Sequence, residues 1–101
     1  MDDLYRGPKR EYRLAAREMD AIRKRLMYRA THRGTKEADR LVGGFAGEYL
    51  AGLNGDELTE FERVLDESDV DLMNWLTGKE GIPADRRGGI MDRLLSYTRS
   101  L

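Results

Sequence analysis

Residues 36–50 read KEADRLVGGFAGEYL, and this stretch decides the fold. Its apolar residues recur at steps of three and four and share one face of a helix: Ala38, Leu41, Val42, Phe45, Tyr49 and Leu50. Gly43, Gly44 and Gly47 stand inside this helix, where each costs about 1 kcal/mol relative to alanine. Because a glycine lets another backbone come close, we expect a neighbouring helix to pack here.

The same spacing predicts helices on both sides of this stretch. Upstream, a helix runs from about Lys9 to Thr31 with a narrow apolar stripe. Downstream, Asn54 and Glu57 have the spacing of a capping box, and Ser68 offers an N-cap for the next helix. A last helix follows Pro83 and ends at the C-terminus. No stretch alternates with period two over a strand's length, so the sequence predicts an all-α fold, a small five-helix bundle.

Length and composition fix the domain organisation. A chain of 101 residues accommodates one domain, which we place at 10–101. Residues 1–9 carry Gly7-Pro8 and no apolar periodicity, and they are expected to be a flexible tail. No run reaches the length of a membrane span. The start of the chain has no apolar core segment and carries acids early, so it does not read as a targeting segment, and we expect a cytoplasmic protein. We also expect a monomer.

The residue inventory excludes several kinds of chemistry. The chain has 0 cysteines and 1 histidine, which rules out disulfides, thiol catalysis and sites with two imidazoles. No nucleophile, base and orienting residue stand together as a triad, and no acidic run has the spacing of a calcium loop. The sequence therefore predicts neither an enzyme nor a metal site. Trp75, at helical spacing, is expected in the core rather than at an interface.

Charge is segregated along the chain. Residues 1–40 hold 12 Lys and Arg against 7 Asp and Glu, whereas residues 41–80 hold 2 against 10. Such a split predicts a basic and an acidic face, each able to orient a partner. The basic run Arg23-Lys24-Arg25, with Arg29 and Arg33, keeps open the alternative of a small nucleic-acid-binding regulator. Few aromatic residues accompany it, so a protein partner is favoured over nucleic acid.

The segment Thr31–Glu37 is the most informative one for function. Gly34 is predicted to end the first helix in a left-handed conformation, and Glu37 favours the start of the next helix. This interpretation leaves His32 and Arg33 unexplained. A second interpretation is a contact corner, where the bare Gly34 backbone admits close approach and Arg33 grips a carboxylate or phosphate with its fork.

Three segments, in order, resemble one family. The segments are Arg25-Leu-Met-Tyr-Arg29, then His32-Arg-Gly-Thr-Lys-Glu-Ala-Asp39 with Gly44-Phe45, then Asp69-Val-Asp-Leu-Met-Asn-Trp-Leu76. Together they resemble the succinate dehydrogenase assembly factors that promote flavinylation, whose hallmark Arg-Gly-x-x-Glu stands here as Arg33, Gly34 and Glu37. The resemblance covers about residues 22–98. The family often has Pro where Val70 stands.

The resemblance implies a five-helix bundle without a cofactor of its own. It implies a chaperone that binds the flavoprotein subunit of succinate dehydrogenase, and of fumarate reductase as a further partner, and helps FAD become covalently attached there. The implied partner-binding residues are Arg33, Gly34, Glu37, His32, Arg29, Arg25 and Tyr28. An enzyme with its own flavin is the third alternative, and 101 residues leave no room for a dinucleotide fold.

Overall fold

The computed structural model describes the backbone of residues 2–101 and the side chains of residues 16–101. The elements follow one another as α1 Asp2–Thr31, α2 Lys36–Tyr49, η1 Leu50–Gly52, α3 Gly55–Leu65, α4 Asp69–Leu76, η2 Ala84–Arg86 and α5 Gly89–Arg99. Five α-helices and two short 3₁₀ turns make up the described part of the chain, and no strand is found in it. The all-α prediction is confirmed.

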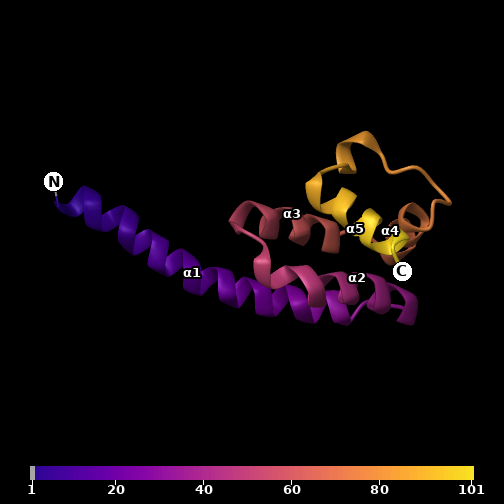
Figure 1. The fold of residues 1–101 in the computed structure, drawn as a ribbon, viewed down its shortest axis with the longest axis horizontal. Coiled ribbons are helices and arrows are strands. Elements are labelled where there is room, and N and C mark those ends of the chain that lie inside the picture. The colour runs from indigo at the N-terminus through magenta and orange to yellow at the C-terminus, as the bar shows by residue number, and fades with distance from the viewer. Residues whose placement is uncertain (1) are drawn as a thin grey trace.

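Helix α2 runs back along the C-terminal half of α1, and α3 to α5 cover the pair (Figure 1). At Gly43 the two helices come so close that a Cβ atom would lie 3.2 Å from the carbonyl oxygen of Ala30. At Gly44 a Cβ would overlap the hydroxyl of Tyr97 on α5. The close approach of another backbone is therefore confirmed for Gly43, whereas at Gly44 the close neighbour is a side chain. For Gly47 the prediction is wrong, since a Cβ there would have no neighbour within 4 Å.

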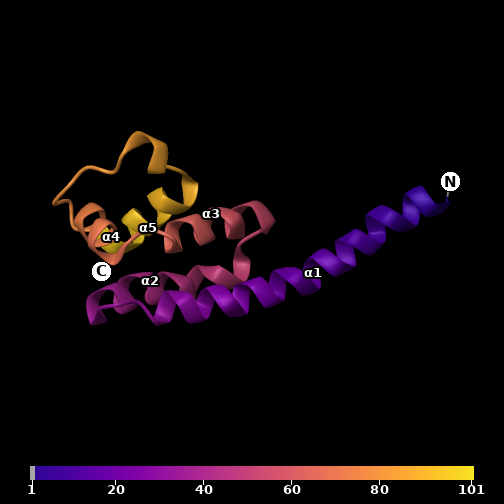
Figure 2. The same cartoon turned by 180° about the vertical axis from the view of Figure 1, so that it is seen from behind.

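The N-terminal half of α1 extends past the rest of the bundle (Figures 1 and 2). The helix begins at Asp2, earlier than the predicted start near Lys9. Apolar periodicity marks only the buried part of a helix, and a helix once formed propagates by its backbone bonds into residues with no such pattern. The prediction that residues 1–9 are a separable tail concerns side chains outside the described ones, and it stays a prediction.

The core lies where α2, α3, α4 and α5 meet the second half of α1. Phe45 and Phe61 are both 0% exposed and their rings lie 5.7 Å apart. Trp75 is 6% exposed, so its predicted place in the core is confirmed. Burying each such aromatic ring stabilises the fold by about 1.5–3 kcal/mol.

Local signals set the starts of α3 and α4 as predicted. Asn54 and Glu57 form the capping box of α3, with both bonds at 2.9 Å. The Ser68 hydroxyl accepts from the backbone N–H of Asp71 and begins α4.

Within the described chain, no helix has the length and apolarity that a bilayer crossing requires.

Candidate functional site

Residues 32–35 form the corner between α1 and α2. Helix α1 ends at Thr31, and α2 begins at Lys36 with Thr35 as its N-cap. The Thr35 hydroxyl accepts from the backbone N–H of Ala38 at 3.1 Å. This bond satisfies one of the free N–H groups at the start of α2 and fixes where the chain turns.

Gly34 occupies the turn for a different reason than predicted. The left-handed conformation expected of a helix stop is absent here, because Gly78 is the one glycine with positive φ in the described chain. Instead, the backbone N–H of Gly34 donates to Oδ2 of Asp69 at 2.6 Å. A Cβ on residue 34 would lie 2.7 Å from the same oxygen, so any side chain would displace the carboxylate. The prediction of a conformational stop is wrong, and close approach explains the glycine.

All three nitrogens of the Arg33 guanidinium donate hydrogen bonds to acceptors of the same chain. Its Nε donates to Oδ1 of Asp69 at 2.7 Å, Nη1 to the carbonyl of Leu65 at 2.7 Å and Nη2 to the carbonyl of Glu67 at 2.8 Å. The side chain is 9% exposed. In this structure the fork expected to grip a partner's carboxylate or phosphate grips Asp69 and the end of α3, and so ties the corner to the α3–α4 junction.

Two carboxylates hold the corner, one from α2 and one from α4. Asp69 accepts from Arg33 and Gly34 together, while Oδ1 of Asp39 accepts from the backbone N–H of Arg33. Burial alone would raise the pKa of Asp69, but the bonds from Arg33 and Gly34 and the charge of Arg33 outweigh it and hold that pKa below its ordinary value. Asp69 therefore stays ionised at neutral pH and keeps both bonds.

The Arg33–Asp69 pair is the last of three ion pairs that join α1 and the corner after it to the acidic part of the chain. Arg25 pairs with Glu62 at 2.9 Å, and Arg29 pairs with Asp66 at 2.7 Å. The arginines follow at steps of four, with Arg25 and Arg29 on α1 and Arg33 in the corner, and they meet carboxylates of α3, the α3–α4 junction and the start of α4. Part of the predicted basic face is thus paired within the chain, and its ability to orient a partner stays a prediction.

The remaining predicted residues lie on the surface beside the corner. Tyr28 is 63% exposed, and its ring stacks on that of His32 with the centroids 3.9 Å apart. Nδ1 of His32 lies 2.8 Å from the Tyr28 carbonyl oxygen, which only accepts, so this nitrogen carries the proton and the ring is held in place. Glu37 is exposed in the first turn of α2 and pairs with Arg40 at 3.0 Å.

Sequence reasoning missed Asp69 and Asp39 as parts of this site. In the sequence, both residues stand only within the segments that resemble the family, and a contact is predicted for neither. A signal was present, because Arg25, Arg29 and Arg33 follow at four-residue steps and an acidic segment that lies later in the chain can face them. Which acid meets which arginine depends on how α3 and α4 pack, and spacing alone does not give that.

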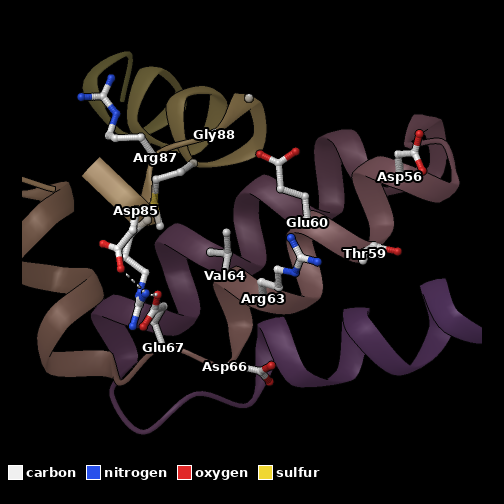
Figure 3. A pocket seen from close by; sticks show the side chains of 13 residues that line it. Asp56, Thr59, Glu60, Arg63, Val64, Asp66, Glu67, Asp85, Arg87 and Gly88 are labelled. Atoms are coloured by element: carbon white, nitrogen blue, oxygen red, sulfur yellow. Dashed lines mark hydrogen bonds and ion pairs between the residues drawn. The ribbon is translucent and has the colours of Figure 1, made fainter. Parts of the chain in front are cut away.

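A groove of about 750 Å³ lies between α3 and the segment from η2 to the start of α5 (Figure 3). Val64 and Met91 contribute apolar surface, and charged side chains line the rest. Several of these charges hold the fold: Arg86 pairs with Glu67 at 2.7 Å, and Glu60 accepts from the backbone N–H of Ile90 at 2.7 Å. Glu60 thereby caps α5, whose own N-cap residue is a glycine. Charged residues of the groove are thus engaged in contacts that hold the fold, and none of the predicted site residues lines the groove.

Among the described side chains, no group of three His, Asp or Glu residues lies together in a way that could hold a metal ion. What the corner offers is a rigid turn, with an exposed aromatic pair on one side and an exposed carboxylate on the other. Fold and site thus define a class: a small all-helical protein with a surface corner locked by its own ion pairs.

Comparison with known proteins places the chain within that class. The family profile described as flavinator of succinate dehydrogenase matches residues 24–98. The FAD assembly factor SdhE of Acetobacter pasteurianus is 37% identical over 86 residues, which cover 85% of this chain and 79% of that protein. Mitochondrial succinate dehydrogenase assembly factor 2 of Mycosarcoma maydis is 40% identical over 75% of this chain but 34% of its own length. The chain belongs to the family of flavinators of succinate dehydrogenase, as the resemblance predicted.

Proposed function

We propose that this chain binds the flavoprotein subunit of succinate dehydrogenase and promotes the covalent attachment of FAD to that subunit. The observation that carries the proposal is the match of residues 24–98 to the flavinator family, which spans the end of α1, the whole corner, α2 to α4 and nearly all of α5. The name of the bacterial relative, FAD assembly factor, points the same way. Fumarate reductase, whose flavoprotein subunit the resemblance includes, is proposed as a further partner.

The site residues divide into two groups in this proposal. Arg33 and Gly34, joined by Asp69, fix the shape of the corner, and Arg25 and Arg29 brace α1 beside it. Tyr28, His32 and Glu37 face outward and touch the flavoprotein. A corner fixed before binding loses little conformational freedom when the partner docks, which favours affinity.

The chain acts as a chaperone and not as the catalyst in this proposal. The flavin and the flavoprotein supply the bond-forming groups, and this chain carries no cofactor. By binding one arrangement of the flavoprotein more tightly than the others, it raises the population in which attachment proceeds. We expect it to work as a cytoplasmic monomer.

The test replaces the exposed carboxylate of the motif. Glu37→Ala removes a surface ion pair with partners 53% and 59% exposed, and such pairs contribute at most about 1 kcal/mol. We expect a folded variant by circular dichroism that binds the flavoprotein poorly and supports less covalent flavin, seen as in-gel flavin fluorescence of the denatured subunit. Glu48→Ala, an exposed change on the same helix, is the matched control. If Glu37→Ala supports full covalent flavin, Glu37 does not contact the flavoprotein. If the wild-type chain itself does not increase covalent flavin, the proposed function is overturned.

The nucleic-acid alternative draws no support from the structure. It relied on the basic row of α1, and three arginines of that row are paired with carboxylates of the same chain. Phosphate contacts there would require each arginine to exchange its partner, which adds a cost to every contact.

A further inference from the structure

The corner of α1 and α2 is joined to the first turn of α4. Asp69 is the first residue of α4, and its two carboxylate oxygens accept from Arg33 and Gly34 at 2.7 and 2.6 Å. The next residue, Val70, therefore lies beside the corner, although it is far from it in sequence. Its side chain is 70% exposed.

Exposed apolar side chains belong to both helices that adjoin this corner, α1 and α4. Among the described residues, three large apolar side chains are exposed: Tyr28 at 63%, Val70 at 70% and Leu101 at 62%. Leu101 is the chain end, whereas Tyr28 belongs to the last turn of α1 and Val70 to the first turn of α4. A single exposed apolar residue needs no explanation, but two at one locked corner are typical of a contact surface.

We propose that the partner-binding surface continues from the corner onto α4, and that Val70 touches the flavoprotein together with Tyr28. This inference rests on the proposed function and adds a contact residue from outside the Arg-Gly-x-x-Glu motif. It commits to the flavoprotein because the new surface is continuous with the corner through the Asp69 bonds.

The charges around these apolar residues are balanced. Glu37 and Asp71 are exposed carboxylates, and Lys36 and Arg40 are exposed cations beside Glu37 in α2. Apolar side chains with polar residues of both signs around them are typical of a surface that binds a protein. A surface without a positive excess has no net attraction for lipid phosphates or nucleic-acid backbones.

Val70→Asp is the test, because it changes the surface and leaves the fold unharmed. An acidic residue in the first turn of a helix interacts favourably with the helix dipole, so we expect a melting temperature close to that of the wild type. Binding to the flavoprotein is expected to weaken at least about tenfold, since a charge then faces an apolar patch. Val70→Ile keeps the apolar surface and is expected to bind like the wild type.

Ala51→Asp is the matched control, because Ala51 is an exposed apolar residue of η1, at the opposite end of α2 from the corner, and its affinity is expected to stay within about twofold. Val70→Ser repeats the test without a charge, should Val70→Asp prove unstable. If the wild type binds the flavoprotein and folded Val70→Asp and Val70→Ser bind it equally well, the inference is overturned while the proposed function stands. If the wild type itself fails to bind, the proposed function fails, and the inference with it.

Discussion

Asp69→Asn tests whether one carboxylate locks the corner. Both oxygens of Asp69 accept from N–H groups, Nε of Arg33 and the backbone N–H of Gly34. An asparagine in the same place has one oxygen and one NH₂ group, so in either orientation a donor faces a donor. The substitution therefore loses at least one bond completely and leaves the other with a neutral acceptor.

The size of the effect follows from burial. Hydrogen bonds to charged groups contribute about 1.5–3 kcal/mol, and removing one partner of a buried ion pair costs about 3–5 kcal/mol. The Asp69 side chain is 23% exposed, and Arg33 keeps its bonds to the carbonyls of Leu65 and Glu67, which lowers the second figure. We expect the free energy of unfolding at pH 7 to fall by about 2–3 kcal/mol.

Urea unfolding at several pH values is the assay, because the pKa of Asp69 is lowered in the folded chain. An aspartate in the unfolded chain titrates near a pKa of about 3.9, and the folded chain holds its proton off to lower pH. The stability that Asp69 contributes is thus fully present above about pH 5, declines below about pH 4 and is gone below the folded pKa. The gap between wild type and Asp69→Asn is expected to close over that range.

Asp71→Asn is the control, since Asp71 is exposed in the same first turn of α4 and is expected to matter by at most about 1 kcal/mol. The reasoning is refuted if the Asp69→Asn gap is below about 0.5 kcal/mol at pH 7, which is the range of ordinary surface changes. It is equally refuted if the gap has the same size at pH 7 and pH 3.

Two further changes probe the packing. Gly34→Ala puts a Cβ 2.7 Å from Oδ2 of Asp69 and is expected to lower the free energy of unfolding by about 1–3 kcal/mol. Gly47→Ala has no neighbour within 4 Å and is expected to raise the free energy of unfolding by about 0.5–1 kcal/mol. Equal effects in urea unfolding would contradict close approach as the reason for Gly34. Phe61→Ala removes a ring that is 0% exposed and is expected to cost about 3–5 kcal/mol, and an unchanged denaturant midpoint would show that α3 buries another face.

The features that sequence predicted correctly depend on neighbours along the chain. Apolar steps of three and four gave the five helices, and the pairs that cap α3 and α4 lie three residues apart. Gly43 was predicted to pack closely and does, but the same argument failed for Gly47, because one glycine at helical spacing looks like another until the facing helix is placed. Local chemistry fixes an element, and tertiary packing decides which of its faces is covered.

The site was harder to predict, because its bonds join residues far apart in the chain. The Gly34–Asp69 bond spans 35 residues, and the Arg33 bond to Leu65 spans 32. The sequence offered a local explanation for Gly34, a left-handed helix stop, and the structure replaced it with a distant one. Likewise, the charge split was visible in the sequence, but whether it served a partner or the fold depended on the packing of α3 against α1.

The residues of the motif Arg33-Gly34-x-x-Glu37 therefore have two different roles. Arg33 and Gly34 bind one carboxylate of their own chain, so substituting either changes the corner's shape before any partner is met. Glu37 lies one helical turn further on and, apart from a surface pair with Arg40, faces outward. A loss of flavinylation after changing Arg33 or Gly34 consequently does not show that these residues touch the flavoprotein. Substitutions of the exposed Glu37 and Val70 are expected to change the stability of the fold little, so they are the ones that report on contact with the flavoprotein.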